Sequence, residues 1–291
     1  MYHDRTYRLF FTCTDDFCKI FEEWEEKNLI SNSMRRKRAS RMSLSEQLTI
    51  VIFYHFSGYK NFKYFYKFFV EKRPDLFPKT LSYNRFIELM PRLTTPVAIL
   101  MHLFKGEKNG TYFIVSTKLQ ICHNKRTGSN RVFKGLAKLG KSSYGWFMGF
   151  KLHIIINSIG EIMAVKITKG NVDDRLPADQ LADGLVGKIF GDKGYIDNKL
   201  WNKLWKKGLQ MIHGIKKNMK NYLLPLQDKL LLRKRSLVEG VFNIMKNVFN
   251  LEHTRHRSPV NFLVNTMSCI VAYIFRCYYN KKTRNTNLIP N

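Results

Sequence analysis

The sequence predicts a mixed α/β protein, in which an all-helical N-terminal domain precedes a sheet flanked by helices. Residues 1–105 show the apolar periodicity of several short helices, and three strand-like segments follow at 112–121, 150–157 and 161–168. Helical and strand patterns then alternate up to a final helix, an order typical of a central sheet covered by helices. With 44% hydrophobic residues, the 291-residue chain can bury the core that this fold needs.

The first element that can be justified locally begins at Ser43. Ser43 and Glu46 stand at capping-box spacing, the apolar residues after them recur at helical intervals, and Gly58 supplies a stop. A further helix is predicted over 82–90. Short helices joined by tight turns suit a helix-turn-helix-like DNA-binding domain over 1–105, and they suit a small helical bundle equally well.

The charge balance points to a polyanionic partner. Lysine and arginine number 50 against 22 acidic residues, a net charge of +28, which favours nucleic acid over a membrane surface or an acidic protein. Five scattered cysteines without a CxxC pair are typical of a reducing cytosol. The most apolar stretch, 260–275, is shorter than the roughly 20 residues of a membrane span and is predicted to be a core helix. We therefore expect a cytoplasmic, nucleoid-associated protein that does not enter a membrane.

Two carboxylates stand out as candidates for chemistry. Asp192 ends an apolar strand between Gly191 and Gly194, where it is either a turn residue or part of a site. Glu239 lies in a predicted helix over 226–248, on one stripe with Arg235 and Lys246. Carboxylates suit Mg²⁺ or Mn²⁺, and two such ions about 3.5–4 Å apart can support phosphodiester cleavage.

A basic segment without acidic residues covers 122–147. It contains Lys125, Arg126, Arg131 and Lys134 and is interpreted as a loop between the first two strands. The segment is either simply solvated or in contact with the DNA backbone, and the second interpretation is preferred because phosphate neutralisation dominates affinity for DNA. A second basic run, 34–41, is a linker or a phosphate-contacting arm.

Several segments, taken in order, resemble the catalytic domain of DDE-type bacterial insertion-sequence transposases. They are GFKLHIIIN (149–157), KGNVDDR (169–175), IFGDKGY (189–195) and LLRKRSLVEGVFNIMKN (231–247). The resemblance covers about residues 110–279 and leaves a polar tail from 280 to 291. It implies an RNase H-like fold in which Asp192 and Glu239 are catalytic and bind metal. The family's Tyr-x2-Arg-x3-Glu-x6-Lys motif matches Arg235, Glu239 and Lys246, with Leu232 at the tyrosine position.

The sequence departs from the family pattern at one position. The family's first catalytic aspartate falls on Val115, in IVSTKL, and a valine cannot ligate a metal. The two-metal site is therefore expected to be weakened. Asp173 and Asp174 are the nearest carboxylates, but in the family their loop is a separate feature, so they are not expected to replace the missing ligand.

The resemblance implies a transposase that binds the terminal inverted repeats of its element and target DNA as a homo-oligomer. Arg235, Lys246 and the basic segment would contact DNA, and strand cleavage and transfer would be the reaction. Because of Val115, this copy is predicted to be catalytically impaired. The alternatives are a non-catalytic DNA-binding protein that occupies element ends and represses transposition, and a nuclease of the same fold acting on RNA–DNA hybrids.

Overall fold

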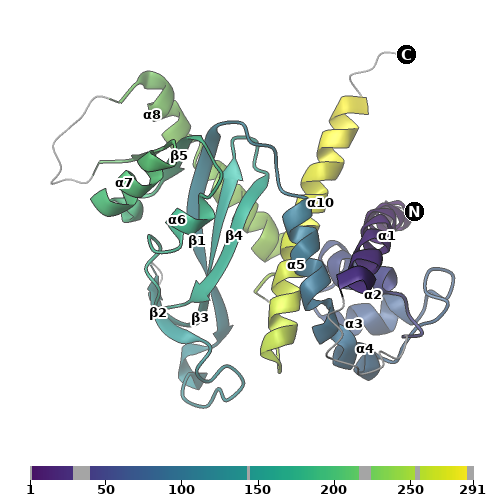
Figure 1. Ribbon diagram of the computed structural model, residues 1–291. Coiled ribbons are helices and arrows are strands. Elements are labelled where there is room, and N and C mark those ends of the chain that lie inside the picture. Colours follow the sequence, from purple (N-terminus) through teal and green to yellow (C-terminus); the bar gives the residue numbers. More distant parts are fainter. Residues whose placement is uncertain (1, 29–39, 143–144, 216–223, 253–255, 287–291) are drawn as a thin grey trace. The chain divides into compact units, whose positions relative to one another are not determined.

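The computed structural model describes residues 2–28, 40–142, 145–215, 224–252 and 256–286 (Figure 1). The chain forms two compact units, one of Met1–Phe104 with Met245–Asn291 and the other of Lys105–Ile244. The sheet-bearing unit thus ends at Ile244, whereas the sequence-based catalytic domain runs on to 279. The functional roles of the two parts stay predictions. Residues 34–39 of the basic run 34–41 lie outside the described residues.

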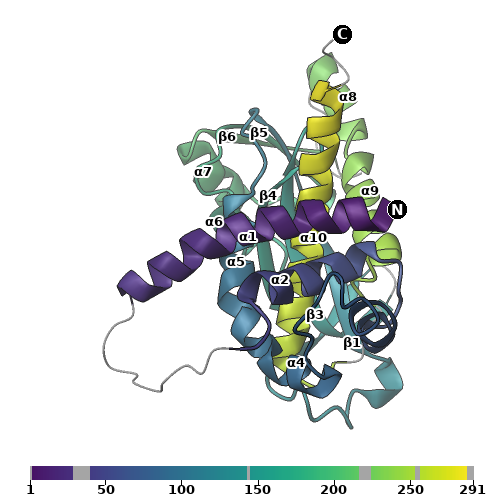
Figure 2. The same cartoon turned by 90° about the vertical axis from the view of Figure 1, so that its right-hand side faces the viewer.

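Helices build the first compact unit. They are α1 (Tyr2–Asn28), which Figure 2 shows along its length, α2 (Leu44–Phe53), α3 (Phe62–Phe65), α4 (Tyr83–Leu89), α5 (Thr94–Leu103) and α10 (Pro259–Thr286). The predicted capping box is present, because the Glu46 amide donates to Ser43 Oγ at 3.1 Å and the Ser43 amide donates to Glu46 Oε2 at 2.7 Å. The glycine stop is present as well, with Gly58 at φ +75°.

Aromatic rings fill the core of this helical unit. Phe10 meets Phe56 edge to face at 4.6 Å and Phe275 of α10 at 5.2 Å. By length and composition Pro259–Lys281 could span a membrane, yet 72% of its most apolar window is buried inside the protein. Burial of this kind agrees with the core helix expected from the sequence. α10 also continues to Thr286, so residues 280–286 are helical and not part of a loose tail, and residues 287–291 lie outside the described residues.

The second unit is built on a six-stranded mixed sheet. Its spatial order is β2-β3-β1-β5-β6, with β4 also paired to β3. β1, β2, β3 and β4 pair antiparallel, whereas β1, β5 and β6 run parallel. The strands are β1 (Thr111–Cys122), β2 (Lys138–Ser142), β3 (Gly145–Asn157), β4 (Ile162–Lys169), β5 (Gly187–Gly191) and β6 (Leu209–His213).

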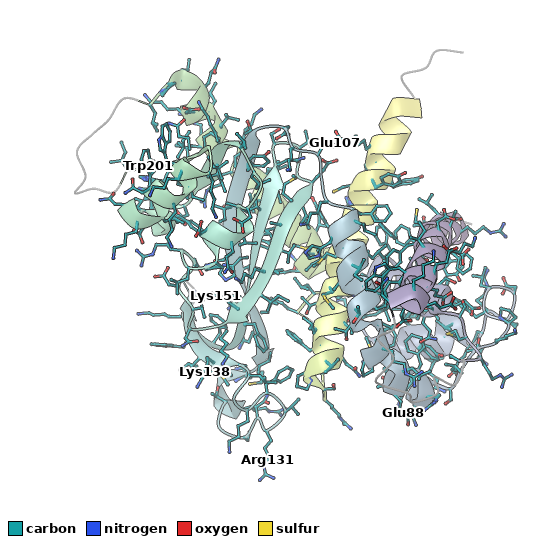
Figure 3. All side chains as sticks on the ribbon, in the orientation of Figure 1. Glu88, Glu107, Arg131, Lys138, Lys151 and Trp201 are labelled. Atoms are coloured by element: carbon teal, nitrogen blue, oxygen red, sulfur yellow. The ribbon has the colours of Figure 1, made fainter. Side chains whose placement is uncertain are left out.

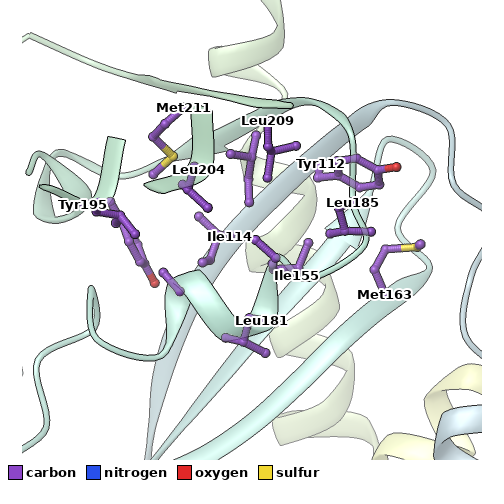
Figure 4. Close-up of a cluster of buried hydrophobic side chains, with 14 residues drawn as sticks. Tyr112, Ile114, Ile155, Met163, Leu181, Leu185, Tyr195, Leu204, Leu209 and Met211 are labelled. Atoms are coloured by element: carbon purple, nitrogen blue, oxygen red, sulfur yellow. The ribbon is translucent and has the colours of Figure 1, made fainter. Parts of the chain in front are cut away.

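Helices cover both faces of this sheet. Figures 1 and 2 place α6 (Ala178–Leu181) and α7 (Asn198–Lys206) on one side of the strands, and α8 (Leu226–Arg233) and α9 (Ser236–Asn243) on the other. The α6–α7 side buries a hydrophobic cluster around Ile114 of β1 (Figure 4). α9 contacts β1 but contributes no residue to that cluster. A mixed sheet between two layers of helices is the RNase H-like arrangement, so the predicted fold class is confirmed.

Two elements differ from the sequence-based expectation. β2 lies inside the segment interpreted as a loop, and β3 begins at Gly145 rather than at residue 150. Leu139 is the single apolar side chain in KLGKS, so no alternation of apolar and polar residues marks this strand. The helical segment after β4 is short and covers only Ala178–Leu181, α6.

The predicted continuous helix over 226–248 is divided into three pieces. α8 ends at Arg233, and α9 begins at Ser236 after a turn whose amides bond three residues back, such as Leu237 N to Lys234 O at 2.9 Å. A π-helical turn, Ile244–Val248, follows α9. The tighter turn before α9 and the wider turn after it change the angular spacing of the side chains along this segment.

Candidate functional site

The parallel pairing of β1 with β5 brings residues 115 and 192 to the same level of the sheet. Tyr112 pairs with Ile189 and Phe113 with Phe190. The same register, continued two residues beyond the paired segment, sets Val115 opposite Asp192. Because successive side chains of a strand point to opposite faces, Val115 points away from the face of Ile114 and toward the side of α9.

Asp192 combines a local turn role with exposure to solvent. Its Oδ1 accepts a hydrogen bond from the Lys193 amide at 2.6 Å, which caps the short 3₁₀ turn Lys193–Tyr195. Its Oδ2 lies 3.8 Å from Nη1 of Arg235, and its side chain is 58% exposed. Asp192 therefore caps a turn, as one of the two interpretations of the sequence proposed. Its side chain is still exposed to solvent beside the Arg235 guanidinium.

Gly191 is closely packed where β5 reaches this turn. A β-carbon at this position would lie 2.5 Å from Cε of Met211, a flexible side-chain end that can shift, and 3.2 Å from the Tyr195 ring. Gly194 has open space around it and a negative φ. Of the two glycines singled out in the sequence, only Gly191 is therefore in a crowded position.

Glu239 is an exposed residue in the first turn of α9. The helix is fixed to the unit through the buried side chains of Val238 and Val241, and it contacts β1. Glu239 thus stands on the helix that packs against the strand bearing Val115. Arg235, at the turn before α9, lies beside Asp192.

The residues present do not make up a complete site for two divalent ions. Within the part of the chain that the structure describes, no three His, Cys, Asp or Glu side chains are grouped closely enough to hold a metal. The third position is the half-buried hydrocarbon of Val115, and the Arg235 cation stands beside Asp192. Two carboxylates and a valine fit the expected donor set poorly, so no reaction step through a metal is derived.

Lys246 is already engaged in an ion pair. Its Nζ lies 2.7 Å from Glu252 Oε1, and both residues belong to the helical unit. The predicted phosphate contact of Lys246 therefore has a carboxylate as competitor.

The four predicted basic residues before β2 are all exposed. Lys125 and Arg126 form the 3₁₀ turn Asn124–Arg126, and Arg131 and Lys134 follow in the loop before β2. Figure 3 shows Arg131 and Lys138 at the same end of the sheet. Several basic side chains are therefore gathered around the β2 end of the unit.

A polar cluster that the sequence did not predict lies on the opposite face of β1. Ser116 Oγ donates to Asp174 Oδ2 at 2.8 Å, and Lys151 Nζ donates to Asp174 Oδ1 at 2.9 Å. The imidazole of His153 is fully buried with Nδ1 4.0 Å from the same carboxylate, and desolvation lowers its pKa to about 4. Ser116 faces away from Val115, so Asp174 lies on the wrong side of the strand to replace the missing aspartate.

Asp173 is held apart from the site by a different partner. Its carboxylate accepts hydrogen bonds from Nε and the amide of Arg175, both at 2.9 Å. The side-chain bond from Arg175 lowers the pKa of Asp173 to about 2. Both aspartates of the Asp173–Asp174 loop therefore make structural contacts. The contacts of Asp174 with β1 and β3 could not be predicted, because they join residues far apart in the sequence.

Comparison with known proteins supplies a family. Residues 105–259 match the family model described as transposase DDE domain, which is more than half of the chain. No curated protein and no solved structure matches this chain. The matched segment spans the whole sheet, both candidate carboxylates and position 115. The chain belongs to the family of transposases with a DDE domain.

Proposed function

We infer that this chain is the transposase of an insertion sequence, that it binds the element's terminal inverted repeats and target DNA, and that this copy cleaves DNA poorly. The observation that supports impaired cleavage is the β1–β5 register, which sets Val115 level with Asp192 on the side of α9. A hydrocarbon at that point supplies no ligand and no base. The remaining carboxylates, Asp192 and Glu239, lack the partner that the resemblance implies.

Binding of DNA is supported by charge. The net charge is +28, and four exposed basic side chains cluster before β2, namely Lys125, Arg126, Arg131 and Lys134. Such a surface gains affinity for duplex DNA by releasing counterions, without reading sequence. The helical unit is proposed to read the inverted repeats, and a dimer or larger assembly is proposed to hold two element ends. We place this activity in the cytoplasm, at the nucleoid.

A second candidate function follows from the same valine. A chain that keeps its DNA-binding surfaces without cleavage would occupy element ends and exclude an active relative. This non-catalytic function differs from transposition in one measurable respect, the nicking of bound ends.

The two functions are separated by one pair of assays. Inverted repeats identified in the DNA flanking the gene serve as the probe for a mobility shift, and the same DNA is incubated with protein and Mg²⁺ or Mn²⁺ in a nicking assay. Retarded DNA that stays intact supports the non-catalytic function. Retarded and slowly nicked DNA supports an impaired transposase, whereas failure to retard the repeats contradicts both.

A further inference from the structure

Leu139, Lys141, Trp146 and Met148 share one face of the β2–β3 ribbon. The antiparallel register pairs Leu139 with Met148 and Lys141 with Trp146, and directly opposed residues project to the same side. Trp146 is 56% exposed and Leu139 is 45% exposed, so two large apolar side chains on neighbouring strands face solvent. We call these four residues the ribbon face.

The reverse side of the same ribbon is closed. Phe147 is fully buried, and a β-carbon on Gly140 would lie 2.1 Å from the carbonyl oxygen of Gly170. A β-carbon on Gly149 would likewise lie 2.0 Å from the carbonyl oxygen of Leu119. Packing of backbone on backbone therefore fixes the ribbon from behind and leaves its apolar side chains on the other face.

Basic groups surround the ribbon face and no acidic residue is near in sequence. Nζ of Lys141 lies 5.8 Å from the centre of the Trp146 ring. The Asn124 side-chain amide donates to the Trp146 carbonyl at 2.7 Å, which ties the turn bearing Lys125 and Arg126 to this strand. Residues 122–147 contain no aspartate or glutamate. Like charges of this density oppose the docking of a second copy and favour a polyanion.

We propose that the ribbon face is a duplex-DNA contact in which Trp146 and Leu139 meet bases and sugars in a groove while the surrounding lysines and arginines meet phosphates. A two-stranded ribbon has the dimensions to enter a DNA groove. Apolar side chains gain little from phosphates but gain from bases and sugars. The proposal rests on the proposed DNA-binding function. It adds to that function an apolar contact whose contribution to affinity does not depend on the salt concentration.

The test measures affinity for duplex DNA at several salt concentrations for full-length variants. Trp146→Ala should weaken binding roughly tenfold at every salt concentration, because the variant loses the apolar area that the indole would bury in the groove. The slope of log affinity against log salt should stay as in the unaltered chain. Lys141→Ala should instead reduce that slope by about 0.9, the loss of one phosphate contact.

Matched variants separate this contact from folding and from general tryptophan effects. Trp205→Ala removes a tryptophan that is 55% exposed on α7, and binding should be unchanged. Figure 3 shows Trp201, the stacking neighbour of Trp205, far from Lys138 within the unit. Trp146→Phe should keep most of the affinity, and Leu139→Ala should repeat the loss in milder form even if Trp146→Ala does not fold.

Three outcomes overturn the proposal. The first is DNA binding by Trp146→Ala and Leu139→Ala equal to that of the unaltered chain. The second is a loss that appears only as a changed salt slope. The third is a DNA-free dimer, seen by sedimentation, that Trp146→Ala dissociates. Failure of the unaltered chain to bind any DNA would instead remove the proposed function, and with it this contact.

Discussion

At the scale of single residues, the site is defined by which face of β1 each side chain occupies. Val115 points toward α9, and its neighbour Ser116 points into a polar cluster with Asp174 and Lys151. Position 115, where the family has a carboxylate, and Ser116, which contacts the Asp174 carboxylate, are adjacent in sequence but lie on opposite faces of the strand. The sequence contains an aspartate close in space to β1, but the pleat of the strand keeps it from position 115.

Removal of the Asp174 charge should destabilise the second unit. Asp174→Asn leaves the largely buried Lys151 ammonium without its anionic partner, which costs about 1–3 kcal/mol. The free energy of unfolding from urea titration measures this loss. Asp183→Asn is the control, because Asp183 is 65% exposed in its ion pair with Lys207 and should show no measurable change. Equal losses in the two variants would contradict a structural role for the cluster.

At the scale of elements, features that depend on residues near in sequence could be predicted from the sequence. Features that depend on contacts between distant residues could not. The capping box at Ser43, the stop at Gly58 and the apolar strand β1 were all predicted, since each depends on residues near in sequence. β2 was not predicted, because its place is fixed by pairing with β3 and by glycine contacts rather than by its own pattern. The Ser116–Asp174 bond joins residues far apart in the chain and leaves no periodic signal.

The glycines where β1, β2 and β3 meet should be intolerant of a methyl group. In Gly149→Ala the added β-carbon would lie 2.0 Å from a main-chain oxygen of Leu119, and backbone cannot move away cheaply. We expect a loss of stability of several kcal/mol or failure to fold, on the order of other overpacked core sites. Gly128→Ala, with nothing within 4 Å, is the control and should melt like the unaltered chain. A melting temperature of Gly149→Ala equal to that of the control would show that the strand contact is wrong.

At the scale of the whole molecule, buried histidines make the fold sensitive to mild acid. Burial lowers the pKa of His55, His153 and His256 to about 4 from an ordinary value near 6.5. Below pH 6.5 the unfolded chain binds protons that the folded chain excludes, so stability is complete above pH 6.5 and falls as the pH approaches 4. Urea unfolding at pH 7.5, 6 and 5 should show a progressive decrease.

A histidine variant tests the source of this decrease. His55→Gln, which replaces a fully buried imidazole in the helical unit, should reduce the dependence on pH between 6.5 and 5, a range above the titration of ordinary carboxylates. The exposed His102 should make no difference when replaced in the same way. Stability that stays constant from pH 7.5 to pH 5 would contradict the burial of neutral imidazoles.

The whole account depends on the valine at position 115, and strand cleavage of inverted-repeat DNA with Mn²⁺ tests it most directly. We predict only slow cleavage by the unaltered chain, faster cleavage by Val115→Asp, and loss of that gain in Val115→Asp combined with Glu239→Gln. All three proteins should retard the same DNA, because neither position 115 nor position 239 belongs to the basic segment 122–147. Cleavage by the unaltered chain as fast as that by Val115→Asp would contradict the central claim, since a complete site would then exist without an aspartate at position 115.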